Sequence, residues 1–456
     1  MAIFTPRSGN LIQNASFESG LSYWQSENAE AANSSPSEGN QSAALTGGVG
    51  SLFQIVPLPA IQRSPLFLSF ITYGNQEEGT ANLTAKVIWL NAELNEIGIG
   101  LSAVIPASNI QLARVTFFDV TDTPPLGAFW AKLLFSRSAA ESTIYLDLVN
   151  LAPVRSINLI QNPSFERGLD GWITEDISTS FASALEGTAS ASGQLLGVLR
   201  QIVPLRPLSI GSAYLLSFSC FAESNIVSLV VRWLNILGMP IGDPAINVSV
   251  AAATLGQQDN YLNIVQLTPP APPCAVAAEI ELSYTNELAS APFIDQVLLI
   301  RMDSANLLEN PGFALGLEGW TSQNVTLLDT NAYVGSNYAG LAEGGALIHQ
   351  TVALPPLAHS GSFLFNFALH YAGIDADNGL VTAQVLWLDR NCREIGLGAS
   401  LNILQEVQAK QQWQVYTAFT ERAPINAVAA RIQFAKSEGA AGTVIGLDSV
   451  TFAKVR

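Results

Sequence analysis

Few residues of this 456-residue chain are of the types that carry out catalysis. Its three histidines, His349, His359 and His370, have no partner at the spacing of a metal site or a catalytic triad. No Gly-x-Ser-x-Gly elbow, glycine-rich phosphate loop or His-Glu-x-x-His motif occurs. Paired carboxylates for glycoside hydrolysis stay compatible with the sequence. We predict a protein that binds or assembles and is not an enzyme.

Aromatic side chains are the other candidates, because an exposed ring can stack on a sugar or pack against a partner. Trp130 alternates with Lys132, which places it on the polar face of its expected strand. A gapped alignment puts Glu279 and Arg431 at its position elsewhere in the chain, so Trp130 indicates a contact particular to the N-terminal part. Weaker candidates of the same kind are Tyr73, Tyr371 and Trp413. The competing interpretation is that scattered exposed aromatics are ordinary on protein surfaces.

Composition and charge exclude several classes of partner. The chain is 48% hydrophobic and 12% charged, with a net charge of -17. Nucleic acids and anionic membrane surfaces need a Lys/Arg footprint, so we expect no nucleic-acid partner. No run of about 18 apolar residues occurs, so we expect no membrane span. The negative charge is compatible with calcium, or it simply serves solubility.

The elements that position these residues come in three copies. An opening block recurs with a period of 148 residues (158 − 10 and 306 − 158), which is the size of a whole domain. Its copies are NLIQNASFESGLSYW at Asn10–Trp24, NLIQNPSFERGLDGW at Asn158–Trp172 and NLLENPGFALGLEGW at Asn306–Trp320. A QIVPL-like block, a WLN…IG block and a closing block with an aspartate follow in the same order in each copy.

Each copy has the pattern of short strands bounded by Gly, Pro, Asn and Asp. We predict an all-β protein of three tandem jelly-roll β-sandwich domains, at residues 1–154, 155–303 and 304–456. Trp89, Trp233 and Trp387 lie on the apolar face of their strands and are expected in the core. The opening-block tryptophans, Trp24, Trp172 and Trp320, are expected to pack in the core or at the sandwich edge, the alternative being that they stack on a sugar ring. The connectors are short, at residues 152–157 and 301–305, so we expect a fairly rigid rod.

The opening block and the closing Leu-Asp-x-Val segment resemble jelly-roll modules of the galactose-binding-like type, in particular carbohydrate-binding modules of families 4, 9 and 22. The QIVPL and WLN…IG blocks are more similar still to a domain found ahead of collagen-like repeats in spore-surface proteins of Firmicutes. The resemblance covers almost the whole chain three times. It implies the fold strongly and a ligand only weakly, because one fold hosts many functions.

In such modules a calcium ion often ties the opening segment to the last strand. The resemblance therefore implies structural calcium at the opening carboxylates and the closing carboxylates, which here are Glu18 and Glu166, and Asp147, Asp295 and Asp448. Ala314 replaces the opening carboxylate in the third copy, so a site there is in doubt. The alternative is that the closing aspartate accepts hydrogen bonds from a turn and the glutamate is solvated.

Two functions of different classes follow. The first is a non-catalytic structural protein of a bacterial spore or cell surface, which self-associates or packs with other surface-layer proteins. The N-terminal residues lack the pattern of a classical signal peptide, which suits deposition from inside the mother cell; the alternative location is the cytoplasm. The second function is polysaccharide binding through several weak sites that gain from avidity.

Overall fold

The computed structural model describes the chain from residue 9 to residue 455, with gaps between some segments. The described ranges are 9–34, 36–59, 63–74, 81–110, 114–138, 142–193, 196–205, 211–223, 225–256, 258, 260–286, 291–342, 344–372, 379–403 and 412–455. The side chains of residues 286, 371 and 372 are not described.

Within the described ranges, the chain folds into three units of ten strands, and each unit consists of two five-stranded antiparallel sheets. The strands of the first unit are β1 (Gln25–Glu27), β2 (Ala29–Ala32), β3 (Ser42–Leu45), β4 (Ser51–Pro57), β5 (Leu66–Gly74), β6 (Leu83–Leu90), β7 (Glu96–Ile105), β8 (Val115–Val120), β9 (Trp130–Arg137) and β10 (Ile144–Pro153), with helix α1 (Ala107–Ile110). One sheet has the order β1-β4-β9-β6-β7 and is called the outer sheet. The other has the order β2-β3-β10-β5-β8 and is called the inner sheet, because its edge strand β8 contacts the other units.

The second and third units repeat both strand orders. The second unit contains β11 (Ile173–Glu175), β12 (Ser178–Ser180), β13 (Ser190–Ser192), β14 (Leu196–Pro204), β15 (Ala213–Phe221), β16 (Asn225–Leu234), β17 (Ile246–Val250), α2 (Ala252–Leu255), β18 (Leu262–Leu267), β19 (Ala277–Asn286) and β20 (Phe293–Met302). The third unit contains β21 (Thr321–Gln323), β22 (Val325–Leu328), β23 (Tyr338–Leu341), β24 (Gly344–Ala353), η2 (Ala358–Ser360), β25 (Phe363–Ala372), β26 (Val381–Leu388), β27 (Glu394–Ile403), β28 (Trp413–Phe419), β29 (Ala429–Glu438) and β30 (Val444–Lys454).

Alternating burial explains why these segments pair as sandwiches. In β9 the residues Ala131, Leu133 and Phe135 are fully buried, while the residues between them lie on the half-buried face. Side chains of a strand point to opposite faces, so each sheet turns one apolar face onto its partner sheet. The prediction of an all-β chain of tandem jelly-roll sandwiches is confirmed. The domain limits at 154/155 and 303/304 stay predictions.

The six predicted structural tryptophans lie inside the units. Trp89, Trp233 and Trp387 are at most 4% exposed, as the strand alternation predicts. The opening-block tryptophans are 7–8% exposed, and each donates its indole N–H to the backbone carbonyl of an asparagine in its own block, which is Asn14, Asn162 or Asn310. Both sets therefore serve packing within the units.

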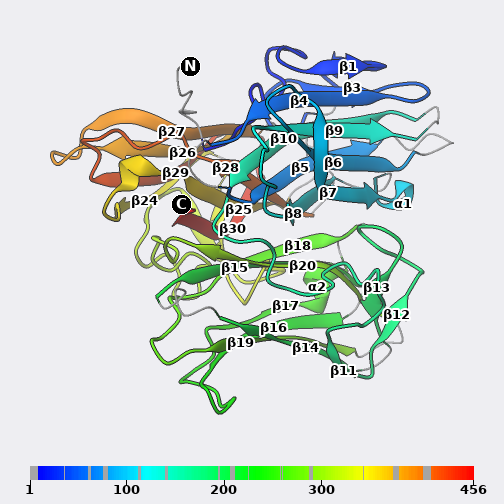
Figure 1. The fold of residues 1–456 in the computed structure, drawn as a ribbon. Helices are drawn as coiled ribbons and strands as arrows, with labels where there is room; N and C mark the ends of the chain where they lie inside the picture. The colour runs from blue at the N-terminus through cyan, green and yellow to red at the C-terminus, as the bar shows by residue number, and fades with distance from the viewer. Residues whose placement is uncertain are drawn as a thin grey trace.

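The expectation of a rod is wrong, because the three units close into a ring around a common junction (Figure 1). The edge strands β8, β18 and β28 of the inner sheets contact one another at its centre. Each also packs on the closing strand of a neighbouring unit: β28 on β10, β8 on β20 and β18 on β30. Because one head-to-tail contact is repeated from each unit to the next, the three units form a closed ring. The ring also covers the edges of three strands that would otherwise be open.

Apolar packing joins the first and third units, and one ion-pair cluster joins residues at or just after the ends of the three closing strands β10, β20 and β30. The rings of Phe67 and Phe419 meet edge-on at a centroid distance of 5.7 Å. Arg155 donates two hydrogen bonds of 2.6 and 2.7 Å to the carboxylate of Asp303. The ammonium of Lys454 lies 3.8 Å from the same carboxylate. The short connectors are compatible with a ring, because the end of the last strand, β30, lies beside the residues that connect the units.

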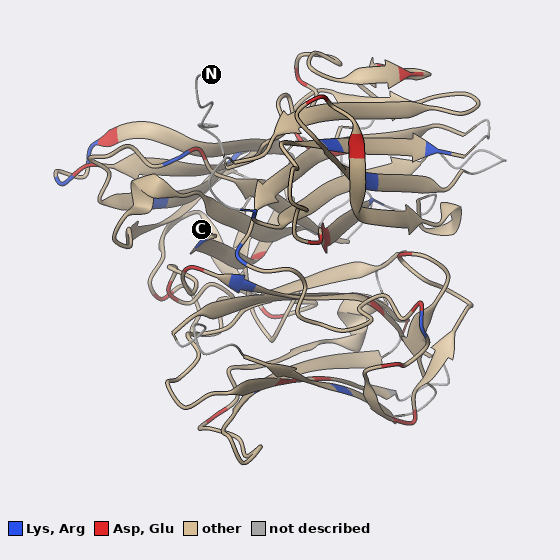
Figure 2. Ribbon diagram, viewed as in Figure 1, with Lys and Arg blue, Asp and Glu red and all other residues tan. Residues whose placement is uncertain are grey.

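Charged residues are sparse over the three units, as Figure 2 shows. Among the described residues, no helix has the length and apolar composition needed to cross a membrane.

Candidate functional site

The closing aspartates hold a turn that precedes the third strand of each unit. In the first unit Asp147 accepts the backbone N–H groups of Ser37 and Glu38, at 2.6 and 2.9 Å, through one carboxylate oxygen. Its other oxygen accepts the N–H of Leu148 at 2.7 Å, where the strand bulges and the backbone φ is 49°. Asp147 is 1% exposed, and burial raises the pKa of its carboxyl well above the ordinary value.

The opening glutamates hold the far end of the same turn. Glu18 accepts the N–H groups of Asn40 and Gln41 at 2.7 and 2.8 Å. In the second unit Glu166 does the same for Thr188 and Ala189, at 2.8 and 2.7 Å. In these two units the opening carboxylate therefore accepts hydrogen bonds from backbone N–H groups of the turn and is not merely solvated.

The closing aspartates of the second and third units accept turn amides in the same way. Asp295 accepts the N–H groups of Leu185 and Glu186, and Asp448 accepts that of Val334. Burial raises the pKa of both carboxyls well above the ordinary value. The third unit has Ala314 in place of the opening glutamate, as the sequence indicated.

Calcium at these carboxylates stays a prediction. Within the described ranges there is no group of three or more His, Cys, Asp or Glu side chains arranged to hold a metal ion. Calcium takes six to eight oxygen ligands. Here N–H donors approach the oxygens of Asp147 and Asp295 from the turn, so a cation bound at the same oxygens would displace them. The donor set fits a hydrogen-bonded turn better than a calcium site.

The turn docks each unit onto the next one around the ring. Gly39 donates its N–H to the carbonyl of Asn402 at 2.7 Å, joining the first unit to β27 of the third. Gly187 donates to Val104 at 2.8 Å, and Gly335 donates to Ser249 at 2.9 Å. The three glycines are spaced by 148 residues, and their acceptors lie on the edge strands β27, β7 and β17. The three junctions are therefore built on one plan.

A glutamate seals two of these junctions. Glu38 accepts the N–H of Asn402 at 2.8 Å, and Glu186 accepts the N–H of Val104 at 3.3 Å. The hydroxyl of Ser16 also bonds to Glu38, and that of Ser164 to Glu186. Burial raises the pKa of both glutamate carboxyls.

The third junction, between the second and third units, lacks the sealing side chains. Gly312 stands at the position of Ser16 and Ser164, and Val334 stands at that of Glu38 and Glu186. With Ala314, three polar side chains of the other copies are replaced by small or apolar ones. A methyl group built at Gly335 would meet nothing within 4 Å, whereas at Gly39 and Gly187 it would collide with the glutamate carboxylate.

A cleft of about 410 Å³ opens at this junction. It is lined by Ser228, Asn247, Val248, Ser249, Val265, Gln266, Leu267, Asn306, Pro311, Gly312, Ala314, Val334, Gly335, Ser336, Ser449, Val450 and Thr451. None of these described residues carries a charge, and hydroxyl and amide groups alternate with aliphatic ones. Its size lies within the roughly 300–1,000 Å³ typical of ligand sites.

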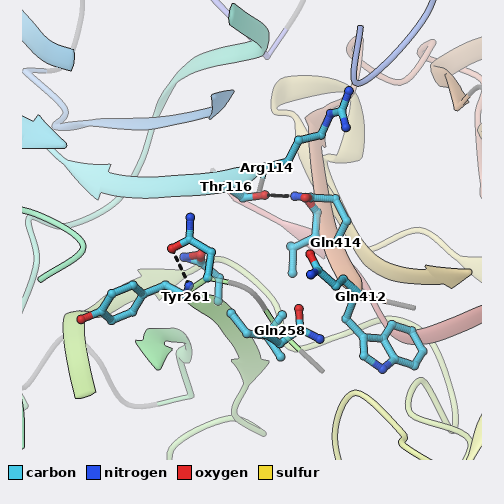
Figure 3. Close-up of a pocket in the computed structure, with 11 residues that line it drawn as sticks. Arg114, Thr116, Gln258, Tyr261, Gln412 and Gln414 are labelled. Carbon is cyan, nitrogen blue, oxygen red and sulfur yellow. Dashed lines mark hydrogen bonds between the residues drawn. The ribbon is translucent and has the colours of Figure 1, made fainter. Parts of the chain in front are cut away.

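A second, much smaller cavity lies where the three edge strands meet (Figure 3). It has a volume of about 10 Å³, which is room for about one water molecule. Thr116 donates its hydroxyl to the carbonyl of Val415 at 2.8 Å, and Gln414 donates to Thr116. Asn260 donates its amide to the carbonyl of Asn109. This cavity is part of the junction's hydrogen-bond network and is too small for an organic ligand.

The aromatic candidates lie apart from the cleft. Trp130 is half-buried at the start of β9, on the same face as Lys132. Tyr73 is half-buried and stacks on Tyr145 at a ring distance of 6.3 Å, with the Arg114 guanidinium 5.1 Å from its centroid. Contacts of Trp130 and Tyr73 with a partner stay predictions. The side chain of Tyr371 lies outside the described part of the chain.

Trp413 is 4% exposed, so the expectation of an exposed platform at this residue is wrong. It donates its indole N–H to the carbonyl of Asn331 at 2.8 Å and stacks on His370 at 5.0 Å. Tyr338 meets the same indole edge-on at 5.3 Å. These three contacts all come from other segments of the third unit, and the residue pattern of one strand does not report them.

The cleft itself was not predicted from the sequence. One signal was available, since Ala314 breaks the repeat at an otherwise acidic position. The companion changes to Gly312 and Val334 have meaning only once the turn is seen to dock on a neighbouring unit.

No protein-family model matches the chain, and a search of curated proteins finds no match. Solved structures similar to it include carbohydrate-binding modules. TmCBM61 in complex with β-1,4-galactotriose is 21% identical over 32% of this chain and 99% of that chain, with a TM-score of 0.26. The CBM22-1–CBM22-2 tandem of Xyn10C from Paenibacillus barcinonensis is 12% identical over 64% and 97%, with a TM-score of 0.27. A family 16 carbohydrate-binding module is 17% identical over 31% and 99%, at 0.25. Scores this low carry no argument about the ligand, which has to come from the cleft.

Proposed function

We propose that this chain is a non-catalytic glycan-binding protein whose ligand occupies the cleft between the second and third units. The observation that carries the proposal is the lining of that cleft, which is uncharged and mixes hydroxyl and amide groups with aliphatic side chains. A sugar presents hydroxyl groups that donate and accept, together with C–H faces that pack on aliphatic carbon. Convergent polar groups in a partly apolar hollow are the usual makeup of such a site.

The same lining supports binding in preference to cleavage. Hydrolysis of a glycosidic bond by the common route uses two carboxyl groups on opposite sides of the bond. The cleft has no Asp, Glu or His among the described residues that line it. General acid–base chemistry would have no titratable side chain to use there.

A cleft-filling substitution tests the proposal against a set of neutral and acidic oligosaccharides in calorimetry or on a glycan array. Ser336 is exposed and lines the cleft, so Ser336→Trp is expected to abolish binding without unfolding the chain. The matched control is Thr188→Trp, at the same repeat position of the sealed junction, which is expected to leave binding unchanged. Absence of binding by the wild-type chain at millimolar sugar would refute the proposal.

A structural role at a bacterial spore or cell surface, with self-association or surface-layer partners, stays a separate prediction. Sedimentation of the purified chain at high concentration, with electron micrographs of the same sample, tests it. A strictly monomeric chain that forms no sheets or filaments would count against assembly and leave glycan binding untouched.

A further inference from the structure

The junction between the second and third units is called open here, and the two junctions with a glutamate are called sealed. The open junction differs from the sealed junctions in whether its backbone amides have a carboxylate to which they can donate. At the junction of the first and second units, Glu186 accepts from the edge-strand amide of Val104, and Glu166 accepts from the turn amides of Thr188 and Ala189. Together two carboxylates take three N–H groups there. The junction of the third and first units repeats this pattern with Glu38 and Glu18.

At the open junction the corresponding amides are those of Ser249, Ser336 and Asn337. Val334 and Ala314, at the places of the two glutamates, have no oxygen in their side chains that could accept from them. Among the described residues, no hydrogen bond is made by the amides of Ser336 and Asn337 to a carboxylate.

The amide of Ser249 is directed toward the cleft. Ser249 lies on β17, the edge strand of its sheet, and its carbonyl accepts the N–H of Gly335 from across the junction. The N–H and C=O groups of one residue in a strand point to the same side. The Ser249 amide therefore faces the side that Glu38 and Glu186 occupy in the sealed junctions.

We propose that the cleft binds a carboxylate in place of the missing glutamates, and that the ligand of the glycan-binding site is an acidic sugar of the uronic-acid type. This inference rests on the proposed function and names its ligand class. A sugar with a carboxylate next to its ring supplies the lost acceptor, while its hydroxyl groups meet the remaining serine, threonine and amide side chains. Backbone amides held in place at the edge of a cleft favour an anion without a lysine or arginine.

The room and the charge around the cleft suit this ligand. No side chain among its described lining residues is acidic, so nothing in the lining repels a carboxylate directly. One acid, Asp448, lies behind the cleft, with a carboxyl oxygen 3.7 Å from a methyl group built at Gly312. That carboxyl is fully buried and accepts the amides of Val334 and Ser449, and burial raises its pKa well above the ordinary value, which favours its uncharged form.

The test uses uronic-acid oligosaccharides and the same oligosaccharides after chemical reduction of each carboxyl to an alcohol, titrated into the full chain by calorimetry. We expect one ligand per chain, because one of the three junctions is open. The acidic form should bind at least about tenfold more tightly than the reduced form, which is what one charge-assisted hydrogen bond provides.

The outcomes separate this inference from the function on which it rests. Equal binding of acidic and reduced sugars would overturn the carboxylate assignment and keep glycan binding. Binding of neither form, nor of any neutral sugar, would overturn both. Binding of a capped glutamate peptide but of no sugar would show that the carboxylate comes from a protein partner, and it would overturn the acidic-sugar assignment.

Two variants restore the glutamates of the sealed copies. Val334→Glu places a carboxylate beside the Ser249 amide and is expected to weaken binding of the acidic sugar at least about tenfold, with no fall in melting temperature. Ala314→Glu, which targets the turn amides, is an independent second variant. Ile425→Glu adds the same charge at an exposed position of the third unit and is expected to leave binding unchanged. Undiminished binding by both well-folded glutamate variants would overturn the inference.

Discussion

The junction between the first and second units and the junction between the second and third units share one backbone plan and differ in what fills it. Both rest on a turn glycine that donates to an edge strand, at 2.8 Å to Val104 and at 2.9 Å to Ser249. Glu186 seals the first, whereas Val334 leaves the second with a cleft of about 410 Å³. A duplicated domain can thus gain a site by losing side chains at a contact whose backbone geometry is already fixed.

The largest effect is expected at the buried aspartate that supports the docking turn of the sealed junction. Asp295→Ala removes the acceptor of the Leu185, Glu186 and Gln296 amides. Buried donors without an acceptor cost about 1–3 kcal/mol each, so we expect a loss of roughly 3 kcal/mol or more in the free energy of unfolding. Chemical denaturation measures it. Asp295→Asn keeps one acceptor oxygen and should lose less; equal losses in the two variants would contradict this account of the turn.

Opening the sealed junction tests whether the side chains alone make the difference. The double variant Glu166→Ala/Glu186→Val copies the third unit into the second. We expect the amides of Val104, Thr188 and Ala189 to exchange with deuterium at least about tenfold faster, because each loses its acceptor while water gains access. Mass spectrometry of the exchanged peptides measures this. Unchanged protection would mean that the backbone, not the glutamates, seals the junction.

The two junctions should also differ in their response to pH. Burial raises the pKa of Asp119 on β8 to about 7, with Glu186 and Asp122 adding repulsion. The matching residue of the open junction is the uncharged Gln266, counted from Thr121 and Thr268, whose hydroxyls accept equivalent strand amides.

A raised pKa in the folded state means that folding takes up a proton. The contribution of Asp119 to stability is therefore fully present below the unfolded pKa of about 4 and is lost as the pH rises through about 7. We expect the melting temperature to fall between pH 5 and pH 8, and we expect Asp119→Asn to flatten that fall. In the free energy of unfolding the difference is roughly 1–2 kcal/mol at most, because Asp119 is partly exposed. An identical pH profile in wild type and variant would rule out this role.

The smallest effect is expected from calcium. The aspartate oxygens that the family resemblance assigned to a cation accept backbone amides in all three units. We expect melting temperatures with calcium and with a chelator to agree within about one degree, because a ligand that binds the folded state must raise its stability. A rise that grows with calcium concentration would establish the metal and require the turn to rearrange.

The same comparison explains what could be predicted in advance. Trp89, Trp233 and Trp387 lie in the cores because strand alternation is a local pattern that one sequence displays. Trp413 was misjudged, since its burial comes from Asn331, Tyr338 and His370, which other segments of the same unit bring against it. The positions that open the cleft are visible in the sequence as departures from the repeat. Such a departure does not show which residues are in contact or whether a cavity forms between them.

The sequence by itself determined the threefold repeat, the β-sandwich class and the core faces of the strands, because these follow from periodicity and composition within each copy. The ring, the docking turns and the cleft were decided only in the tertiary structure. They depend on contacts between residues hundreds of positions apart, such as Gly39 with Asn402, which no local pattern encodes.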